Sequence, residues 1–103
     1  MSPVELFKAL GEPTRLEMVE RLSNYGSQTL TSLFKGMHIT RQGARKHLQI
    51  LADSKIIILL PDGRNTIVQL DQHAFDVGKK FIAKLELRWD KRLEALKNFV
   101  EKK

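Results

Sequence analysis

Long polar and cationic side chains gather on one face of the stretch from Thr40 to Leu51. Ala44, Leu48 and Leu51 recur at i, i+4 and i+7, which predicts a helix that buries this stripe. Thr40 stands just before the stripe, where its hydroxyl can cap free backbone N–H groups. The opposite face then consists of side chains that hydrogen-bond to bases and phosphates: Arg41, Gln42, Arg45, Lys46 and Gln49.

A helix of this kind fits the major groove of duplex DNA. An Arg guanidinium can fork onto guanine, a Gln amide can fork onto adenine, and a Lys ammonium can reach a phosphate. An ordinary surface helix with solvated charges has the same composition, so this stretch alone leaves both interpretations open. The segments on either side of it decide between them.

The composition limits the classes of protein that remain. The 103 residues suit one domain, 1–103, and the formal net charge of +6 favours a polyanionic partner, either nucleic acid or a membrane surface. The absence of cysteine excludes disulfides, thiolate metal sites and cysteine nucleophiles. No apolar run approaches the ~20 residues that span a bilayer, and no signal peptide is visible, so we expect a cytoplasmic protein.

Two short helices are predicted at the start of the chain by apolar residues at every third position. In the first helix these residues are Val4, Phe7 and Leu10, and Gly11 ends it at the C′ position. Pro13 suits the first turn of the second helix, because its missing N–H is harmless there. The apolar stripe of the second helix consists of Leu16, Val19 and Leu22.

A third helix is predicted to begin near Thr31 or Ser32 and to run to Met37. Only two residues, His38 and Ile39, then separate it from the polar helix. Two helices joined so closely must cross steeply, which is helix-turn-helix geometry. His38 would hold the turn position where glycine is commonest, and histidine tolerates a left-handed backbone better than most residues.

A β-hairpin, the wing of a winged helix, is predicted directly after the polar helix. Residues 56–60 are five β-branched or leucine residues in a row, and residues 66–70 form a second strand. Residues 61–65 between them contain Pro-Asp-Gly, a strong turn signal. Arg64 lies at the tip, where it can reach a phosphate or a narrow minor groove, or simply remain a solvated loop charge.

The longest predicted helix runs from residue 71 or 72 to 101. Its apolar residues follow a spacing of three to four. So long a helix overhangs a small body, and its stripe is too apolar to leave in water. We expect it to pair with a second copy about a two-fold axis rather than to pack back across its own domain. The residues expected in this dimer interface are Val4, Phe7, Phe81, Leu85, Trp89, Leu93 and Leu96.

The order of these elements and three sequence segments resemble the ArsR-type winged-helix repressors. The first segment, Leu6–Leu16, contains ALGEPTRL, which in that family marks the end of the first helix and the start of the second. The second, Thr40–Leu48, is similar to the family's recognition helix and has the matching basic-His-Leu ending. Arg88–Leu93 resembles the C-terminal helix of a cysteine-free branch. The resemblance covers nearly the whole chain.

This resemblance implies both a fold and a function. The fold is mainly α with a small β-hairpin, a winged helix-turn-helix whose N- and C-terminal helices form the dimer interface. The function is that of a homodimeric transcription regulator, most often a repressor. Its partners are a second copy and double-stranded DNA, an inverted-repeat operator read by the helix at 40–51 and the wing at 56–70. The two helices would enter successive major grooves about 34 Å apart.

The resemblance also implies roles along the recognition helix. Arg41, Gln42 and Arg45 are expected to read bases, while Thr40 and Lys46 hold phosphates. His47 can face either way, and packing or a phosphate contact is expected before base reading. Gly43 costs ~1 kcal/mol of helix propensity relative to alanine, but it can let the backbone approach DNA closely. The expected DNA-binding residues are Thr40, Arg41, Gln42, Arg45, Lys46, His47 and Arg64.

Metal binding and catalysis are not expected. Asp71 and His73 resemble half of a second metal site of this family, but Lys84 stands where a histidine is needed. Zinc needs about four ligands, so we expect no metal and no cofactor, and Asp71 is more simply a helix N-cap. No phosphate loop or nucleophile motif is present, which argues against an enzyme.

The alternative function is a winged-helix protein-interaction module within a larger complex, without DNA specificity of its own. The basic recognition face argues against it, because a module of that kind needs no Arg–Gln–Arg face. Steep salt dependence of DNA binding would separate the two functions. The sequence specifies neither the operator nor an effector ligand.

Overall fold

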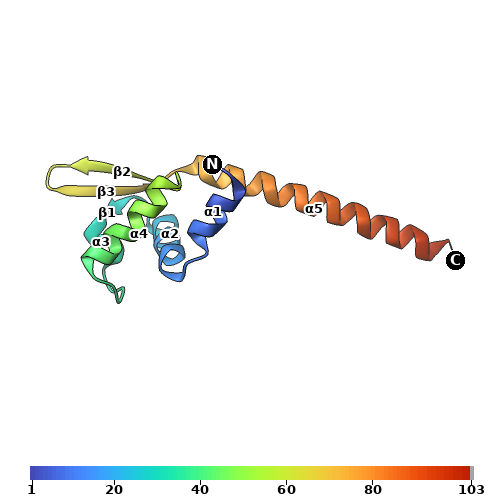
Figure 1. Cartoon of the computed structure of the whole chain (residues 1–103), viewed down its shortest axis with the longest axis horizontal. Helices are drawn as coiled ribbons and strands as arrows, with labels where there is room; N and C mark the ends of the chain where they lie inside the picture. Colours follow the sequence, from blue (N-terminus) through green and yellow to red (C-terminus); the bar gives the residue numbers. More distant parts are fainter. Residues whose placement is uncertain (103) are drawn as a thin grey trace.

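Five helices and three short strands make up the computed structural model, which describes residues 1–102 (Figure 1). The helices are α1 (Pro3–Leu10), α2 (Pro13–Tyr25), α3 (Leu30–Phe34), α4 (Arg41–Asp53) and α5 (Gln72–Glu101). The strands are β1 (Gln28–Thr29), β2 (Ile57–Asp62) and β3 (Asn65–Leu70). They form one antiparallel sheet in the order β1-β3-β2. The fold is the mainly helical winged helix-turn-helix that the sequence predicts.

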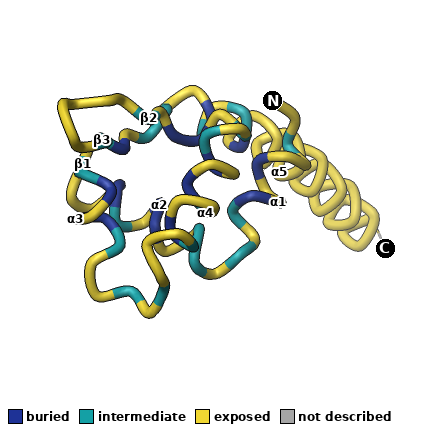
Figure 2. Tube along the Cα trace, turned by 60° about the vertical axis from the view of Figure 1, so that its left-hand side comes forward, coloured by how far each residue is buried: buried dark blue, intermediate teal, exposed yellow. Residues whose placement is uncertain are grey.

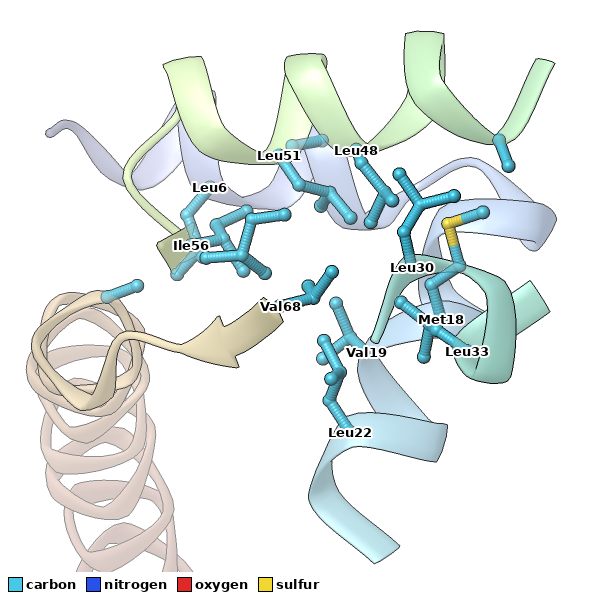
Figure 3. Close-up of a cluster of buried hydrophobic side chains, with 14 residues drawn as sticks. Leu6, Met18, Val19, Leu22, Leu30, Leu33, Leu48, Leu51, Ile56 and Val68 are labelled. Carbon is cyan, nitrogen blue, oxygen red and sulfur yellow. The ribbon is translucent and has the colours of Figure 1, made fainter. Parts of the chain in front are cut away.

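One hydrophobic core holds α1 to α4 against the sheet, a unit that we call the head. α4 buries Ala44, Leu48 and Leu51, which confirms the stripe predicted for the recognition helix. Because this stripe is fixed in the core, the opposite face of α4 must point to solvent. The largest fully buried side chains, drawn in Figure 3, are Leu6, Met18, Leu33, Leu48, Leu51, Ile56 and Val68.

α1 leaves two of its regularly spaced apolar residues open to solvent, on the surface where the sequence analysis expects a dimer interface. Its buried residues are Leu6 and Ala9, whereas Val4 and Phe7 of the predicted stripe are exposed. Both pairs recur at i and i+3, so periodicity alone cannot choose between them. Gly11 ends the helix with a right-handed backbone, φ −75°, and not in the left-handed C′ conformation that we expected.

α2 begins as predicted, with Pro13 in its first turn. Val19 and Leu22 are buried as expected, but Met18 completes the stripe, and Leu16 stays 42% exposed. At 3.6 residues per turn, Leu16 lies roughly 110° around the helix from the centre of the buried stripe. The prediction for Leu16 was therefore wrong, because a spacing of three residues drifts away from a true helical face.

The connection between α3 and α4 is longer than predicted. α3 ends at Phe34, so the residues from 35 to 40 form the turn. Gly36 takes the left-handed conformation, φ 82°, and His38 does not. Our prediction for His38 was wrong because the apolar Met37 extends the helical pattern beyond the point where the helix itself stops.

The strand β1 has no counterpart in the sequence analysis. Gln28 and Thr29 pair with Val68 and Ile67 of β3 and so add a third strand to the wing. Thr29 also caps α3, because its side chain accepts a hydrogen bond from the Ser32 backbone N–H at 3.1 Å. Two residues are too few to show a period of two, so this strand carries no sequence signal.

Both ends of α4 are closed by hydrogen bonds. The Thr40 hydroxyl accepts from the Gly43 backbone N–H at 2.9 Å, which confirms the predicted N-cap. At the other end, the Lys55 N–H donates to the Ala52 carbonyl at 3.0 Å, and the following N–H donates to the Leu51 carbonyl at 2.9 Å. This is a Schellman motif. Lys55 holds its left-handed position with φ 63°, where a residue with a Cβ is strained.

β2 and β3 form the predicted hairpin and continue into the segment that we predicted as a turn. The last pair joins Asp62 to Asn65, so the loop consists only of Gly63 and Arg64. Gly63 has φ 60°, which the first position of such a tight loop requires. On β2, Ile58 and Leu60 are exposed, so the body of the wing is apolar on its outer side.

α5 contacts the head only through its first turns. Asp71 caps it by accepting a hydrogen bond from the His73 backbone N–H at 3.0 Å, as predicted. Every residue from 79 to 102 is exposed, and the helix runs away from the head (Figure 2), giving extents of 70 × 25 × 22 Å. The alternative in which α5 packs back across its own domain was therefore wrong. Within residues 1–102, no helix combines the length and apolarity that a membrane span requires.

Candidate nucleic-acid interface

The solvent face of α4 carries a set of long side chains that have no partner within the chain. Each of these residues is exposed, and none forms a hydrogen bond or ion pair with another residue of the part that the structure describes: Arg41, Gln42, Arg45 and Lys46. Gln49 differs, because its amide donates to the Asp53 carboxylate at 2.8 Å. The N-terminal half of α4 therefore presents free donors and positive charge, and its C-terminal half does not.

The N-terminus of α4 adds to this positive character. Free backbone N–H groups and the helix dipole favour anions at that end, and no acidic residue lies in the first turn. Thr40 is exposed, and its oxygen is already engaged with the Gly43 N–H. Its hydroxyl hydrogen remains available as a donor to a phosphate. A Cβ at position 43 would lie 3.2 Å from Thr40 Oγ1, so a glycine there leaves space for the capping hydroxyl.

His47 is turned from the free side chains of α4 toward α2. Its Nδ1 lies 3.2 Å from Arg15 Nη1 and 3.7 Å from Glu12 Oε2, and its side chain is 25% exposed. The structure thus places His47 as a packing residue with one edge in contact with α2. Sequence reasoning missed this cluster, because its members are separated by more than thirty residues and no local pattern links them.

Glu12 is the N-cap of α2 as well as a neighbour of His47. Its carboxylate accepts a hydrogen bond from the Arg15 backbone N–H at 2.8 Å. This hydrogen bond lowers the pKa of Glu12 below its ordinary value. The Thr14 N–H and the charges of His47 and Arg15 lower the pKa further, while partial burial opposes them. Glu12 therefore remains ionised at neutral pH and places a negative charge beside the recognition helix.

The wing offers a single cation. Arg64 is exposed in the two-residue loop, and no residue of the strands β2 and β3 is basic. The hairpin reaches out from the head, opposite to the end from which α5 leaves (Figure 1). A wing of this kind can touch DNA with its tip, but its body lacks the charges needed to track a phosphate backbone.

The residues expected at the dimer interface form an exposed apolar surface on α1 and α5. The rings of Phe7 and Phe81 join the two helices, with 5.8 Å between their centroids. Beside them lies an apolar groove of about 390 Å³, whose lining includes Leu10, Phe75 and Ile82. All seven predicted residues are exposed in the single chain: Val4, Phe7, Phe81, Leu85, Trp89, Leu93 and Leu96.

The residues considered for a metal site do not gather. Asp71 is occupied as the N-cap of α5, and its neighbour His73 supplies only the backbone N–H to that cap. Within residues 1–102, no group of three or more His, Asp or Glu side chains is placed to hold a metal ion.

Comparison with known proteins relates the chain to transcription factors. No family model matches the sequence, and no curated protein matches it. Among solved structures, an ArsR-like transcriptional regulator from a Rhodococcus species is 25% identical, with 94% of this chain and 91% of that chain covered and a TM-score of 0.79. A second ArsR family transcriptional regulator is 28% identical over 84% and 88% of the two chains, with a TM-score of 0.78.

A third structure, from Mycobacterium bovis, is described as a homodimeric winged helix-turn-helix DNA-binding domain of a possible ArsR-family regulator. It is 21% identical over 87% of this chain and 80% of that one, with a TM-score of 0.63, and this likeness concerns the fold alone. The matching proteins are regulators and not enzymes. The chain has the fold of DNA-binding winged helix-turn-helix regulators.

Proposed function

We propose that this chain binds an inverted-repeat operator as a homodimer and represses transcription there. The premise is that the chain is, by its structural neighbours, an ArsR-family winged helix-turn-helix transcriptional regulator without cysteine. The observation that carries this proposal is the face of α4. Its apolar stripe is buried in the core, while the long side chains on the opposite face of its N-terminal half have no partner within the described chain. A regulator of this kind acts in the cytoplasm, where it meets DNA.

The exposed side chains divide by chemistry into base readers and phosphate holders. Arg41 and Arg45 can form bidentate hydrogen bonds to guanine, and Gln42 can do so to adenine. Thr40 and Lys46 suit phosphates, because a hydroxyl and an ammonium fix position without reading sequence. The wing tip adds one more cation, Arg64, within reach of a phosphate or a minor groove.

A homodimer is supported by the apolar surface of α1 and α5. A lone chain would expose this surface to water, whereas a two-fold pair buries it on both copies. A two-fold pair also duplicates the recognition helix, and two helices about 34 Å apart match successive major grooves on one side of B-DNA. A dimer seated across both half-sites excludes polymerase from the same DNA, which is repression.

Selection of bound fragments from the source genome, followed by titration of the selected duplex at several salt concentrations, tests this function. The logarithm of the association constant should fall linearly and steeply with the logarithm of salt concentration. Arg45→Ala should weaken binding by ~1–3 kcal/mol and relax the preference at one base pair. Lys80→Ala on α5 removes the same charge away from α4 and is the matched control. Binding without sequence preference, or an affinity that does not fall with salt, would reject the proposal.

A protein-interaction module is the second candidate, and the apolar outer face of β2 favours it. Ile58 and Leu60 are exposed there, where a phosphate-tracking wing would carry basic residues. Ile58→Lys distinguishes the two functions. It should raise operator affinity if the wing lies beside DNA, because it adds a cation near the phosphates. Loss of a protein partner without any effect on DNA binding would favour the second candidate.

A further inference from the structure

Two sequence segments that are far apart in the chain meet at one imidazole. The start of α2 contributes Glu12 and Arg15, and the middle of α4 contributes His47. The Nδ1 atom of His47 lies 3.2 Å from the guanidinium Nη1 of Arg15 and 3.7 Å from Glu12 Oε2. These are the segments through which the sequence resembles its family, and neither the reading of bases nor dimer formation accounts for the contact.

Arg15 ties this cluster to a third helix. Its Nε donates to the carbonyl oxygen of Ala9, in the last turn of α1, at 2.7 Å. Its backbone N–H donates to the Glu12 carboxylate at 2.8 Å. Hydrogen bonds thus fix both the backbone and the guanidinium of Arg15, and the same guanidinium contacts His47. α1, α2 and α4 are connected through a single side chain at this point.

The protonation state of the imidazole decides which neighbour its Nδ1 can bond. A guanidinium has only donors, so Arg15 Nη1, which lies 3.2 Å away, forms a hydrogen bond only when Nδ1 is an acceptor. The neutral ring then carries its hydrogen on Nε2, at the edge turned away from Arg15. A protonated Nδ1 would instead direct an N–H at a like charge, and its favourable partner would be the Glu12 carboxylate, 3.7 Å away. The two protonation states of the ring therefore use different partners.

Charged groups on three helices lie beside His47 or beside its partner Arg15. α2 supplies Glu12 and Arg15, and α4 itself supplies the neighbouring Arg45 and Lys46. α1 supplies Glu5 and Lys8, which line a small cavity with Arg15. A DNA phosphate brought to α4 adds negative charge and so favours the protonated ring.

We propose that Arg15 and Glu12 are positioning residues for the recognition helix, and that they make operator binding proton-linked through His47. With neutral His47, the contact to Arg15 holds α4 at a fixed angle to α2. With protonated His47, Nδ1–H bonds to the Glu12 carboxylate in place of Arg15. The added positive charge on α4 then strengthens binding to phosphates. The inference rests on the proposed function for its DNA part, but the contact itself can be tested without DNA.

The experiment has one arm on the free protein. The ¹⁵N chemical shifts of imidazole distinguish an Nε2-protonated ring from an Nδ1-protonated one. At pH 8 the His47 signal, assigned by its loss in His47→Gln, should report the hydrogen on Nε2. Arg15→Met should remove this preference and give mixed tautomers. Retention of the single tautomer in Arg15→Met, or a hydrogen on Nδ1 in the native protein, would overturn the positioning role.

The second arm measures operator affinity between pH 6 and 8 at constant ionic strength. If binding takes up one proton, operator affinity rises by at most about tenfold for each unit by which pH falls. The native protein should show a rise smaller than this limit. His47→Gln should abolish the slope, and Glu12→Gln should reduce it. His38→Gln and His73→Gln are matched controls that should leave it unchanged. A merely structural cluster would give variants with weaker binding and an unaltered slope, which would overturn the linkage. Absence of any operator binding, with the tautomer result intact, would instead count against the proposed function.

Discussion

Trp89→Glu tests whether the exposed apolar surface of α5 is a dimer interface. Trp89 is 61% exposed in the single chain and lies on the same stripe as Leu85, Leu93 and Leu96. Leu87 is 57% exposed but lies two residues, or about 200°, around the helix from Trp89. Leu87→Glu therefore introduces the same charge at a similar exposure on the opposite face of the same helix.

The expected magnitude follows from the exposed area. The apolar residues of α1 and α5 leave on the order of 800 Å² per chain open to solvent, which matches the share of one partner in a standard interface. Burying the exposed part of one Trp, on the order of 120 Å², is worth about 3 kcal/mol at 25 cal/mol per Å². A two-fold pair contains this contact twice, and a buried carboxylate adds a further desolvation cost. Dimer dissociation should therefore become at least about a thousandfold easier.

Sedimentation equilibrium of the two variants at micromolar concentration measures this effect. Trp89→Glu should sediment as a monomer with unchanged circular dichroism, while Leu87→Glu should remain a dimer like the native chain. The reasoning fails if Trp89→Glu stays dimeric, or if both substitutions dissociate the pair equally. Binding of the monomeric variant to a full operator should also fall to the level seen with an isolated half-site.

Three further predictions concern stability. Lys55→Gly should stabilise the chain by roughly 0.5–1 kcal/mol in urea unfolding, because it relieves the left-handed backbone at the end of α4, whereas Lys55→Ala should not. Glu12→Gln should destabilise the chain at pH 6. A carboxylate with a lowered pKa contributes stability that is present above its ordinary value, 4.5, and is lost as pH falls through the folded pKa, so native and variant stabilities should converge toward pH 3. Gly78→Ala should destabilise the chain although alanine has the better helix propensity, because a Cβ at position 78 would lie 2.9 Å from Leu6 Cδ2. Adding Leu6→Val to this variant should recover part of the lost stability.

The elements that the sequence predicts well are those with long, regular patterns. α4 and α5 were predicted almost to their ends, because each has an apolar stripe over several turns and a capping residue at its start, Thr40 or Asp71. The exposed faces followed from the buried ones, which is why the candidate DNA-binding residues of α4 could be named in advance. Arg64 could be placed at the wing tip because Asp-Gly specifies a tight turn.

The errors fall where local pattern competes with packing. The residues of α1 that face the core, Leu6 and Ala9, were not named in advance, because two pairs of apolar residues share the same spacing and only the neighbouring helices decide which pair is buried. The helix-turn-helix connection was misjudged because Met37 is apolar without being helical, and Gly36 supplies the turn. The contact of His47 with α2 depends on tertiary structure alone, so no pattern within either segment could predict it.

α1 links the two halves of the proposed mechanism. On one side it meets α5, where the Phe7 and Phe81 rings contact each other at a tilt of 55° and a Cβ on Gly78 would lie 2.9 Å from Leu6 Cδ2. On the other side its last turn receives the Arg15 side chain, which in turn contacts His47 of the recognition helix. The angle between the long helix and the recognition helix is therefore set through α1 by rigid contacts at both ends. In a two-fold pair this angle determines the separation of the two recognition helices, so half-site spacing depends on the packing of an eight-residue helix that itself need not touch DNA.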